Sequence, residues 1–163
     1  MEIRLAQPNE APAIWRVRNA AIRHGCKGVY ADEVIAAWTP EAMPQGQVAM
    51  IIENPFYIAL SEAGQPVATG FLDIATGSIE AIFTLPEWEG RGLATRIVNT
   101  LKQEALRRGF SRLTLEATPN ACSFYQKRGF KVVRESVYHS KLAGADLQCI
   151  DMICDLAEAS CKT

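Results

Sequence analysis

The chain has 163 residues, of which 48% are hydrophobic and 21% are charged. This length fits one domain and is sufficient to bury a core. The 17 Lys and Arg face 18 Asp and Glu, and the resulting net charge of −1 lacks the basic surplus of a general nucleic-acid binder. No apolar run approaches the ~18 residues of a transmembrane helix, so the composition also excludes a membrane span.

The cysteines and the N-terminus indicate a compartment. The cysteine count is odd, no CxxC pair occurs, and no apolar leader segment opens the chain. We therefore expect reduced thiols and a cytoplasmic protein. His24 and Cys26 lack the second pair of ligands that a zinc site needs, so no metal is expected. The cysteines are Cys26, Cys122, Cys149, Cys154 and Cys161.

A strand and a helix are expected first. Residues 2–5 alternate polar and apolar side chains, which is typical of a strand. Asn9 is the expected N-cap of a helix that continues to about His24, because the apolar residues between them keep helical spacing. Gly25 and Gly28 are expected to end this helix.

A shorter helix, a loop and a strand meander follow. Asp32 can cap a helix over residues 33–38, which Pro40 ends. The stretch 39–55 is punctuated by Pro and Gly, which predicts a loop with a short element inside it. Beyond the loop, turn signals separate three runs with the period of strands, which predicts antiparallel strands over 56–60, 66–74 and 79–85.

The strongest helical pattern in the chain comes next. Its apolar stripe runs from Leu93 to Leu106 at helical spacing. Arg107 and Arg108 occupy the last turn, where positive side chains suit the negative end of the helix dipole. Gly109 is the expected residue just beyond the C-cap.

The remaining elements complete a mixed sheet. A helix joins the strand over 112–117 to the strand before it, so these two strands are expected to be parallel. Asn120 is the expected N-cap of a helix over 121–128, and two further strands are expected over 130–140 and 147–156. The element order predicts an α+β domain over residues 1–156, followed by a tail over 157–163.

The segment that leads into the long helix can bind an anion. Gly90 and Gly92 remove side chains where the backbone must turn tightly. The backbone N–H groups of residues 91–95 lie at the helix start, where together with the helix dipole they form a site for phosphate oxygens. Arg91 adds positive charge, and Arg96 lies one turn further on. The glycines alone also fit a plain strand–helix turn.

Two familiar phosphate-binding patterns do not match this segment. The Walker pattern GxxxxGK[ST] does not occur, and the dinucleotide pattern GxGxxG requires glycine where Thr95 stands. The dinucleotide pattern also belongs to a βαβ unit that opens its domain, whereas here two helices and a strand meander come first. A dinucleotide-dependent oxidoreductase is therefore disfavoured.

Two sequence blocks resemble the GCN5-related N-acetyltransferase (GNAT) family. Residues 89–94, EGRGLA, are similar to its phosphate-binding signature Gln/Arg-x-x-Gly-x-Gly/Ala, although Glu89 stands where the family usually has Gln or Arg. The preceding FTLPEW, residues 83–88, resembles the aromatic-x-x-Pro-Glu-aromatic lead-in. Residues 121–130, ACSFYQKRGF, resemble the motif A-x-x-F-Y-x-x-x-G-F. The predicted element order matches the family over nearly the whole chain.

The resemblance implies a fold and a cofactor. The fold is the three-layer α/β/α acyl-CoA N-acyltransferase fold, whose mixed, mostly antiparallel sheet of about seven strands carries helices on both faces. The cofactor is acetyl-CoA, with its pyrophosphate on the amides of 91–95 and its pantetheine arm paired like a strand with the backbone of 82–84. A backbone N–H of that strand would hold the oxyanion. The implied cofactor-binding residues are Ile82, Phe83, Thr84, Glu89, Gly90, Arg91, Gly92, Leu93, Ala94, Thr95, Asn120 and Tyr125.

The resemblance also implies the catalytic residues. Tyr125 aligns with the family's tyrosine that serves the departing thiolate. Complete proton transfer from a phenol to a thiolate is uphill by about 2 kcal/mol, so a hydrogen bond during bond cleavage is the safer expectation. Glu80 lies where family members often place a carboxylate that acts as the base, and Asp73 and water are alternatives. At pH 7 a peptide-like α-amine is roughly 14% neutral and a lysine-like amine about 0.04%, so the need for a base depends on the acceptor.

The neighbours of these residues have expected places too. Strand alternation puts Glu80 and Ile82 on one face of the sheet, opposite Ile79 and Ala81. Cys122 lies one turn before the tyrosine, but covalent catalysis by its thiol would need an adjacent base. Packing is the preferred role for Cys122.

The acceptor is expected beside the first two helices and the loop 39–55. Aromatic side chains there can wall a pocket, and an arginine can receive a carboxylate. These residue types also fit a core or a solvated face, so they name no acceptor. The candidates are Trp15, Tyr30, Trp38, Met43, Arg16, Arg18, Arg23 and His24.

These features together predict an N-acetyltransferase. It would transfer the acetyl group of acetyl-CoA to a primary amine of a small molecule by direct attack in a ternary complex. Acetylation of a protein N-terminus or a lysine, and a non-catalytic acyl-CoA-binding regulatory module, are the alternatives. No nucleic acid or membrane partner is expected, and a homodimer is left open.

Overall fold

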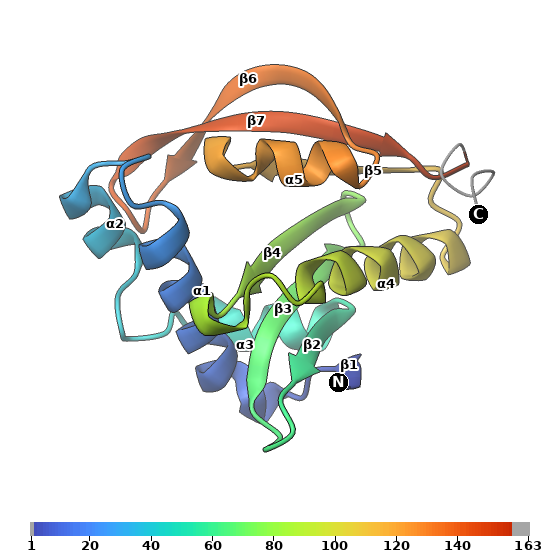
Figure 1. Ribbon diagram of the computed structural model, residues 1–163, viewed down its shortest axis with the longest axis horizontal. Coiled ribbons are helices and arrows are strands. Elements are labelled where there is room, and N and C mark those ends of the chain that lie inside the picture. Colours follow the sequence, from blue (N-terminus) through green and yellow to red (C-terminus); the bar gives the residue numbers. More distant parts are fainter. Residues whose placement is uncertain (1, 158–163) are drawn as a thin grey trace.

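A mixed sheet of seven strands runs through the computed structural model, which describes residues 2–157 (Figure 1). Its order is β1-β2-β3-β4-β5-β7-β6, with β4 and β5 parallel and the other neighbours antiparallel. The predicted α+β class and the parallel pair are thus confirmed. The strands are β1 (Glu2–Leu5), β2 (Phe56–Leu60), β3 (Pro66–Asp73), β4 (Ser78–Thr84), β5 (Arg112–Ala117), β6 (Lys131–Ser140) and β7 (Ala145–Asp155).

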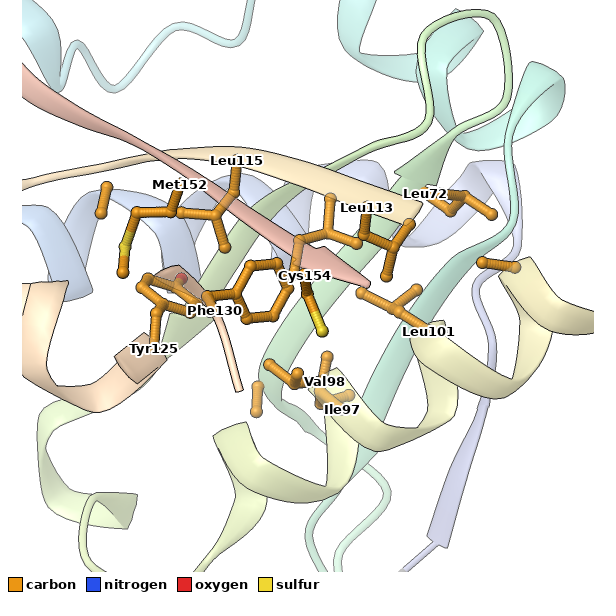
Figure 2. Packing of buried hydrophobic residues seen from close by; sticks show 14 of the residues in the cluster. Leu72, Ile97, Val98, Leu101, Leu113, Leu115, Tyr125, Phe130, Met152 and Cys154 are labelled. Carbon is orange, nitrogen blue, oxygen red and sulfur yellow. The ribbon is translucent and has the colours of Figure 1, made fainter. Parts of the chain in front are cut away.

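The helices cover both faces of this sheet. One buried cluster joins α4 and the tyrosine of α5 to one face, and Figure 2 shows its packing. A second cluster joins α1 and α3 to the opposite face. The helices are α1 (Ala11–Gly25), α2 (Asp32–Trp38), α3 (Gly46–Glu53), α4 (Leu93–Arg107) and α5 (Cys122–Lys127), with short 3-10 turns η1 (Pro8–Glu10), η2 (Pro86–Trp88) and η3 (Pro119–Ala121).

The predicted N-caps were misplaced. Asn9 and Asn120 lie inside the 3-10 turns η1 and η3, so α1 and α5 start later than expected. A proline opens each of these turns, because it fits a first helical position where its missing N–H is not needed. Asp32 is the first residue of α2 rather than its cap. The C-terminal predictions are better, since α4 ends at Arg107 and Gly109 has a φ of +87°.

The short element expected within the stretch 39–55 is the eight-residue helix α3. Its apolar side chains point both ways: Ile51 is buried, whereas Met50 and Ile52 are exposed. No one-sided stripe therefore marks it in the sequence.

Gly70 of β3 sets how closely α4 approaches the sheet. A Cβ atom at this position would lie 2.5 Å from Ile97 Cγ2 of α4 and 2.6 Å from Ile82 Cδ1. The helix can rest on the sheet only because this atom is missing. Its N-terminus is thereby held beside the end of β4.

A bulge in β4 changes which side chains face which layer. Ala81, a non-glycine residue, has a φ of +57°, and the register with β3 shifts there. The Thr69 hydroxyl donates a hydrogen bond to the Ala81 carbonyl at 2.7 Å. Glu80 pairs with Phe71 of the α1 face, whereas Ile82 packs on the α4 face. The prediction that these two side chains share a face is therefore wrong, because the extra residue breaks the alternation.

The described part of the chain leaves two predictions partly untested. The tail over 157–163 and Cys161 lie outside it, except for Ala157, and the four cysteines within it are free thiols. None of the helices among residues 2–157 combines the length and the apolar character needed to cross a membrane.

Candidate active site

A cleft of about 630 Å³ opens where β4 and β5 separate. The two strands share one paired position, Ser78 with Thr114, and diverge beyond it. We call this space the splayed cleft. Residues 79–84 of β4, 115–118 at the end of β5, the start of α4 and part of α5 line it. All of the predicted cofactor-binding residues except Arg91 are among its lining residues.

The turn before α4 presents unpaired amides to the splayed cleft. Gly90 and Gly92 have φ values of +77° and +78°, which confirms the predicted tight turn. The first helical hydrogen bond runs from the Arg96 N–H to the Gly92 carbonyl, at 3.1 Å. The N–H groups of Leu93, Ala94 and Thr95 precede that bond and have no acceptor inside the helix. No atom lies within 4 Å of the Cβ positions at the two glycines, which leaves room for phosphate oxygens.

The charged side chains of this turn point elsewhere. The Arg91 guanidinium lies 4.4 Å from the centroid of the Trp88 ring, outside the lining of the cleft. The Glu89 carboxylate lies 3.9 Å from His24 Nε2 of α1, and both side chains are about half exposed. The contribution of the Arg91 charge to the anion site therefore stays a prediction. The amides and the helix dipole are what this turn offers to an anion.

Tyr125 reaches the splayed cleft from α5. Its side chain is 8% exposed and packs edge-on against Phe124 and Phe130, with ring centroids 5.1 and 5.9 Å away. Figure 2 shows Tyr125 next to Phe130. Burial raises the pKa of its phenol above the ordinary value of a tyrosine. The hydroxyl is therefore a weak acid and serves better as a hydrogen-bond donor. Asn120 of η3 lines the same cleft.

A second space of about 380 Å³ continues from the splayed cleft on the α1 side of β4. We call it the aromatic pocket. The two spaces share lining residues from β4 and β5, including Glu80, Phe83 and Glu116. Side chains from α1, α2, α3 and the β6–β7 hairpin close it, namely Trp15, Arg18, Trp38, Met50, Tyr138 and Leu142.

Glu80 stands where the two spaces meet. Burial is the largest cause of its raised pKa, and the nearby carboxylates of Asp73 and Glu116 raise it further. The Ser78 hydroxyl donates a 3.1 Å hydrogen bond to Glu80 Oε1, which partly opposes that rise. Asp73 lines neither space and accepts a hydrogen bond from the Ala75 N–H at 2.9 Å within its turn. The geometry favours Glu80 over Asp73 as a proton acceptor.

The acceptor candidates from the first helices separate into two groups. Trp15, Arg18, Tyr30 and Trp38 line the aromatic pocket. Arg16 is exposed, and Arg23 donates to the Thr39 carbonyl at 2.6 Å, so neither faces the pocket. Met43 packs against the cluster of α1 and α3.

The residues of the aromatic pocket that were missed in the sequence include Phe71, Glu116 and Tyr138. The alternation of β5 could have revealed Glu116, because Leu115 and Ala117 are buried on the α4 face and Glu116 must then face away. Tyr138 lies on an edge strand whose side chains are mostly exposed, so no local pattern marks it.

The cysteines near the site are not activated nucleophiles. Cys122 lines neither space, whereas Cys26 lines the splayed cleft and Cys149 the aromatic pocket. Burial raises the pKa of Cys26, and it raises that of Cys149 to about 11. The Cys149 thiol donates to Glu116 Oε2 at 3.5 Å. Both thiols are therefore protonated near neutral pH.

Glu116 and Cys149 also form a group with Asp151, in which one possible metal-ligand atom from each residue lies within 4.8 Å of the others. Asp151 is already paired with Arg134 at 2.9 Å. The ion pair and the protonated thiol satisfy this cluster within the protein.

Comparisons with known proteins identify the family and the fold. Residues 26–150 match the family model described as "Acetyltransferase (GNAT) domain". A GCN5-related N-acetyltransferase structure from Rhodopseudomonas palustris is 24% identical, with a TM-score of 0.85 and 94% of each chain covered. The PaiA N-acetyltransferase of Thermoplasma acidophilum, in complex with coenzyme A, is 19% identical, with a TM-score of 0.76 over 94% of this chain and 98% of that one.

A third structure shows the same fold. YncA of Salmonella typhimurium, with its cofactor acetyl-CoA, is 21% identical and has a TM-score of 0.70 over 96% of this chain and 94% of that one. No curated protein sequence matches the chain.

Proposed function

Because the chain belongs to the GNAT acetyltransferase family, we propose that it transfers the acetyl group of acetyl-CoA to a primary amine of a small molecule. The observation that carries this proposal is the meeting of the two spaces at Glu80. One space offers unpaired amides for a phosphate-containing cofactor, and the other offers an apolar, partly enclosed site for an acceptor. A group transfer between the two bound molecules would take place at this junction.

The lining of the splayed cleft fits coenzyme A. The amides of Leu93, Ala94 and Thr95 suit its pyrophosphate, and the glycine turn leaves space for it. The backbone of 82–84 pairs with β3 on one side and has no β5 partner on the other, so an extended pantetheine arm can add there as a strand. A backbone N–H of the same stretch would hold the oxyanion. Bound acetyl-CoA would supply a thioester as the acetyl donor.

The side chains divide the chemistry between them. Glu80 accepts a proton from the acceptor amine, and the Tyr125 hydroxyl donates a hydrogen bond toward the departing sulfur. The amine attacks directly in a ternary complex, because the thiols that line the two spaces are held protonated by burial. All of these residues belong to the single domain proposed over residues 1–156. The proposed reaction uses no metal ion.

The aromatic pocket favours a small acceptor over a protein. Its volume of about 380 Å³ is in the range of small-molecule sites, and side chains of α1, α2 and α3 wall it. A protein N-terminus or a lysine side chain would have to thread between these helices. The cytoplasmic location and the homodimer stay predictions.

The release of thiol from acetyl-CoA over a panel of amines tests the proposal. We expect release with at least one class of small amine, and its loss in the double variant Glu80→Gln/Tyr125→Phe. Calorimetry with CoA, run in parallel, measures cofactor binding independently. Tight CoA binding without turnover on any small amine or peptide would instead identify a non-catalytic module. Turnover on peptides alone would identify a protein acetyltransferase.

A further inference from the structure

Arg18 places a positive charge inside the aromatic pocket. It lies on α1, and its guanidinium carbon is 4.3 Å from the centroid of the Trp15 ring and 5.6 Å from that of Trp38. Burial lowers its pKa to about 10, so the group remains charged at neutral pH. The two indole rings hold the guanidinium plane in one orientation.

The charge of Arg18 has no carboxylate partner among residues 2–157. Nη1 donates to Asn19 Oδ1 at 2.8 Å and to the Trp38 carbonyl at 2.9 Å. Arg4, in contrast, binds both carboxylate oxygens of Glu10, each at 2.8 Å. Within the described part of the chain, the Nε and Nη2 edge of Arg18 therefore keeps its donors for another acceptor. That edge has the fork geometry that matches a carboxylate.

The opposite charge gathers elsewhere in the same pocket. Glu80 and Glu116 line this pocket together with Arg18, whereas the Asp73 carboxylate, which also raises the pKa of Glu80, lies outside it. The Tyr138 side chain, which also lines the pocket, is uncharged at neutral pH. Among residues 2–157 no ion pair joins Arg18 to Glu80 or Glu116, and aromatic side chains of the lining lie around them.

We propose that Arg18 receives a carboxylate of the acceptor, so that the acceptors of this enzyme are amines that also carry a carboxylate. This inference rests on the proposed function, since it names the substrate class of that site. The acceptor amine faces Glu80, the carboxylate on the same carbon binds the Nε and Nη2 edge of Arg18, and the apolar side chain packs against the aromatic lining. Free amino acids with apolar side chains have this chemistry. An unpaired cation in a half-buried pocket is unfavourable, and this acceptor supplies the missing charge.

Matched pairs of amines test the proposal. Each pair contains an amino acid and its decarboxylated analogue: phenylalanine with phenethylamine, tryptophan with tryptamine, and methionine with 3-(methylthio)propylamine. We expect kcat/KM of the wild-type enzyme to favour the amino acid by roughly 10–100-fold, the range for hydrogen bonds to a charged group. Most of the difference should lie in KM.

Variants of Arg18 separate recognition from structure. Arg18→Met keeps a long apolar stem against the indole rings but removes the charge, and it should bring the preference to within a few fold. Arg18→Lys keeps the charge without the fork and should restore part of it. Arg16→Met, on the exposed side of the same helix, is the control and should leave the preference unchanged. A purely structural role of Arg18 would lower the rates for both members of a pair alike.

Calorimetry of the same pairs with the CoA-loaded protein gives a readout that is independent of turnover. Turnover without a preference for the amino acid, or a preference that survives in Arg18→Met, would overturn the inference and leave the proposed function standing. A binding preference for the amino acid that depends on Arg18, with no thiol release, would support the recognition and overturn the proposed function. Equal binding of both members would overturn the inference whatever the turnover.

Discussion

At the scale of single residues, the raised pKa of Glu80 leads to a prediction on pH dependence. A base must be deprotonated to act, so a pKa raised by partial desolvation and by neighbouring carboxylates moves the loss of activity to higher pH than a fully solvated glutamate would give. We expect kcat at saturating acceptor to fall as pH decreases through this raised value. Glu80→Gln should lower kcat at neutral pH roughly 10²-fold and remove that acid limb.

The control for this prediction is Asp73→Asn. Asp73 lies outside both spaces, so its variant should keep the wild-type kcat at neutral pH and the fall at acidic pH. This fall should move to lower pH, because loss of the Asp73 charge lowers the pKa of Glu80. An acid limb that persists in Glu80→Gln but disappears in Asp73→Asn would reverse the assignment of the base. If kcat still falls at acidic pH in both variants, the proton transfer would be assigned to water.

Tyr125 gives a second prediction at this scale. Tyr125→Phe keeps the packing against Phe124 and Phe130 and removes one hydroxyl from the splayed cleft. We expect kcat to fall roughly 10²–10⁴-fold while the CoA dissociation constant stays nearly constant. Tyr57→Phe is the matched control, because its hydroxyl donates to Glu104 Oε1 at 2.7 Å, away from both spaces. Near-normal turnover of Tyr125→Phe would rule out its role at the sulfur.

The residues of the site were predictable where a motif fixed them. The glycine turn and Tyr125 lie in the splayed cleft because their motifs carry the local backbone with them. The orientation of Ile82 relative to Glu80 was not predictable, since the bulge occurs at an alanine and no glycine or proline marks it. The contact between the Arg91 guanidinium and the Trp88 ring was not predictable either, because no pattern in the sequence indicates it.

At the scale of elements, the start of α4 can be tested by a pair of glycine substitutions. Gly92 and Gly64 have nearly the same φ, +78° and +79°, and no atom lies within 4 Å of either Cβ position. Alanine at either position should therefore lower the free energy of unfolding by a similar amount, about 1–2 kcal/mol, because of left-handed backbone strain. Gly92→Ala should also weaken CoA binding about tenfold, since relief of the strain turns the amides of α4 away.

Urea denaturation and calorimetry with CoA measure these two effects separately. Gly64→Ala, in the turn between β2 and β3, should leave the CoA dissociation constant unchanged. Equal losses of CoA affinity in both variants would mean that the α4 turn has no special part in binding.

A helix was easier to predict from the sequence when its apolar residues lay on one side only. Helix α4 has a single apolar stripe and a glycine beyond its end, and its predicted start at Leu93 agrees with the structure. Helix α3 is apolar on more than one side, and α1 and α5 are preceded by proline-initiated 3-10 turns that a capping rule does not foresee. Tertiary contacts, rather than local propensity, decide these cases.

At the scale of the whole molecule, the splayed cleft lies on the seam between two parts of one sheet. Strands β1–β4 and strands β5–β7 meet at the single pair of Ser78 with Thr114, and the buried cluster of Figure 2 joins them on the α4 face. The overall arrangement of this seam was predictable from the parallel crossover between β4 and β5. Its opening was not, because a separation of strands depends on the packing of both halves. Coenzyme A would take the place of the missing strand contacts.

Because the splayed cleft lies between the two parts of the sheet, we expect bound CoA to stabilise both parts together. At a CoA concentration of about 100 times its dissociation constant, binding to the native state alone adds about 2.7 kcal/mol, which for a chain of this size raises Tm by about 5–10 °C. Hydrogen exchange should slow together at 82–84 of β4, 93–95 of α4 and 115–118 beyond the seam, because the cofactor bridges them. Gly92→Ala should reduce both effects at equal CoA concentration. Protection confined to 93–95 would show that the phosphates bind without the arm entering the sheet, since the exchange of β4 and β5 would then be independent of the ligand.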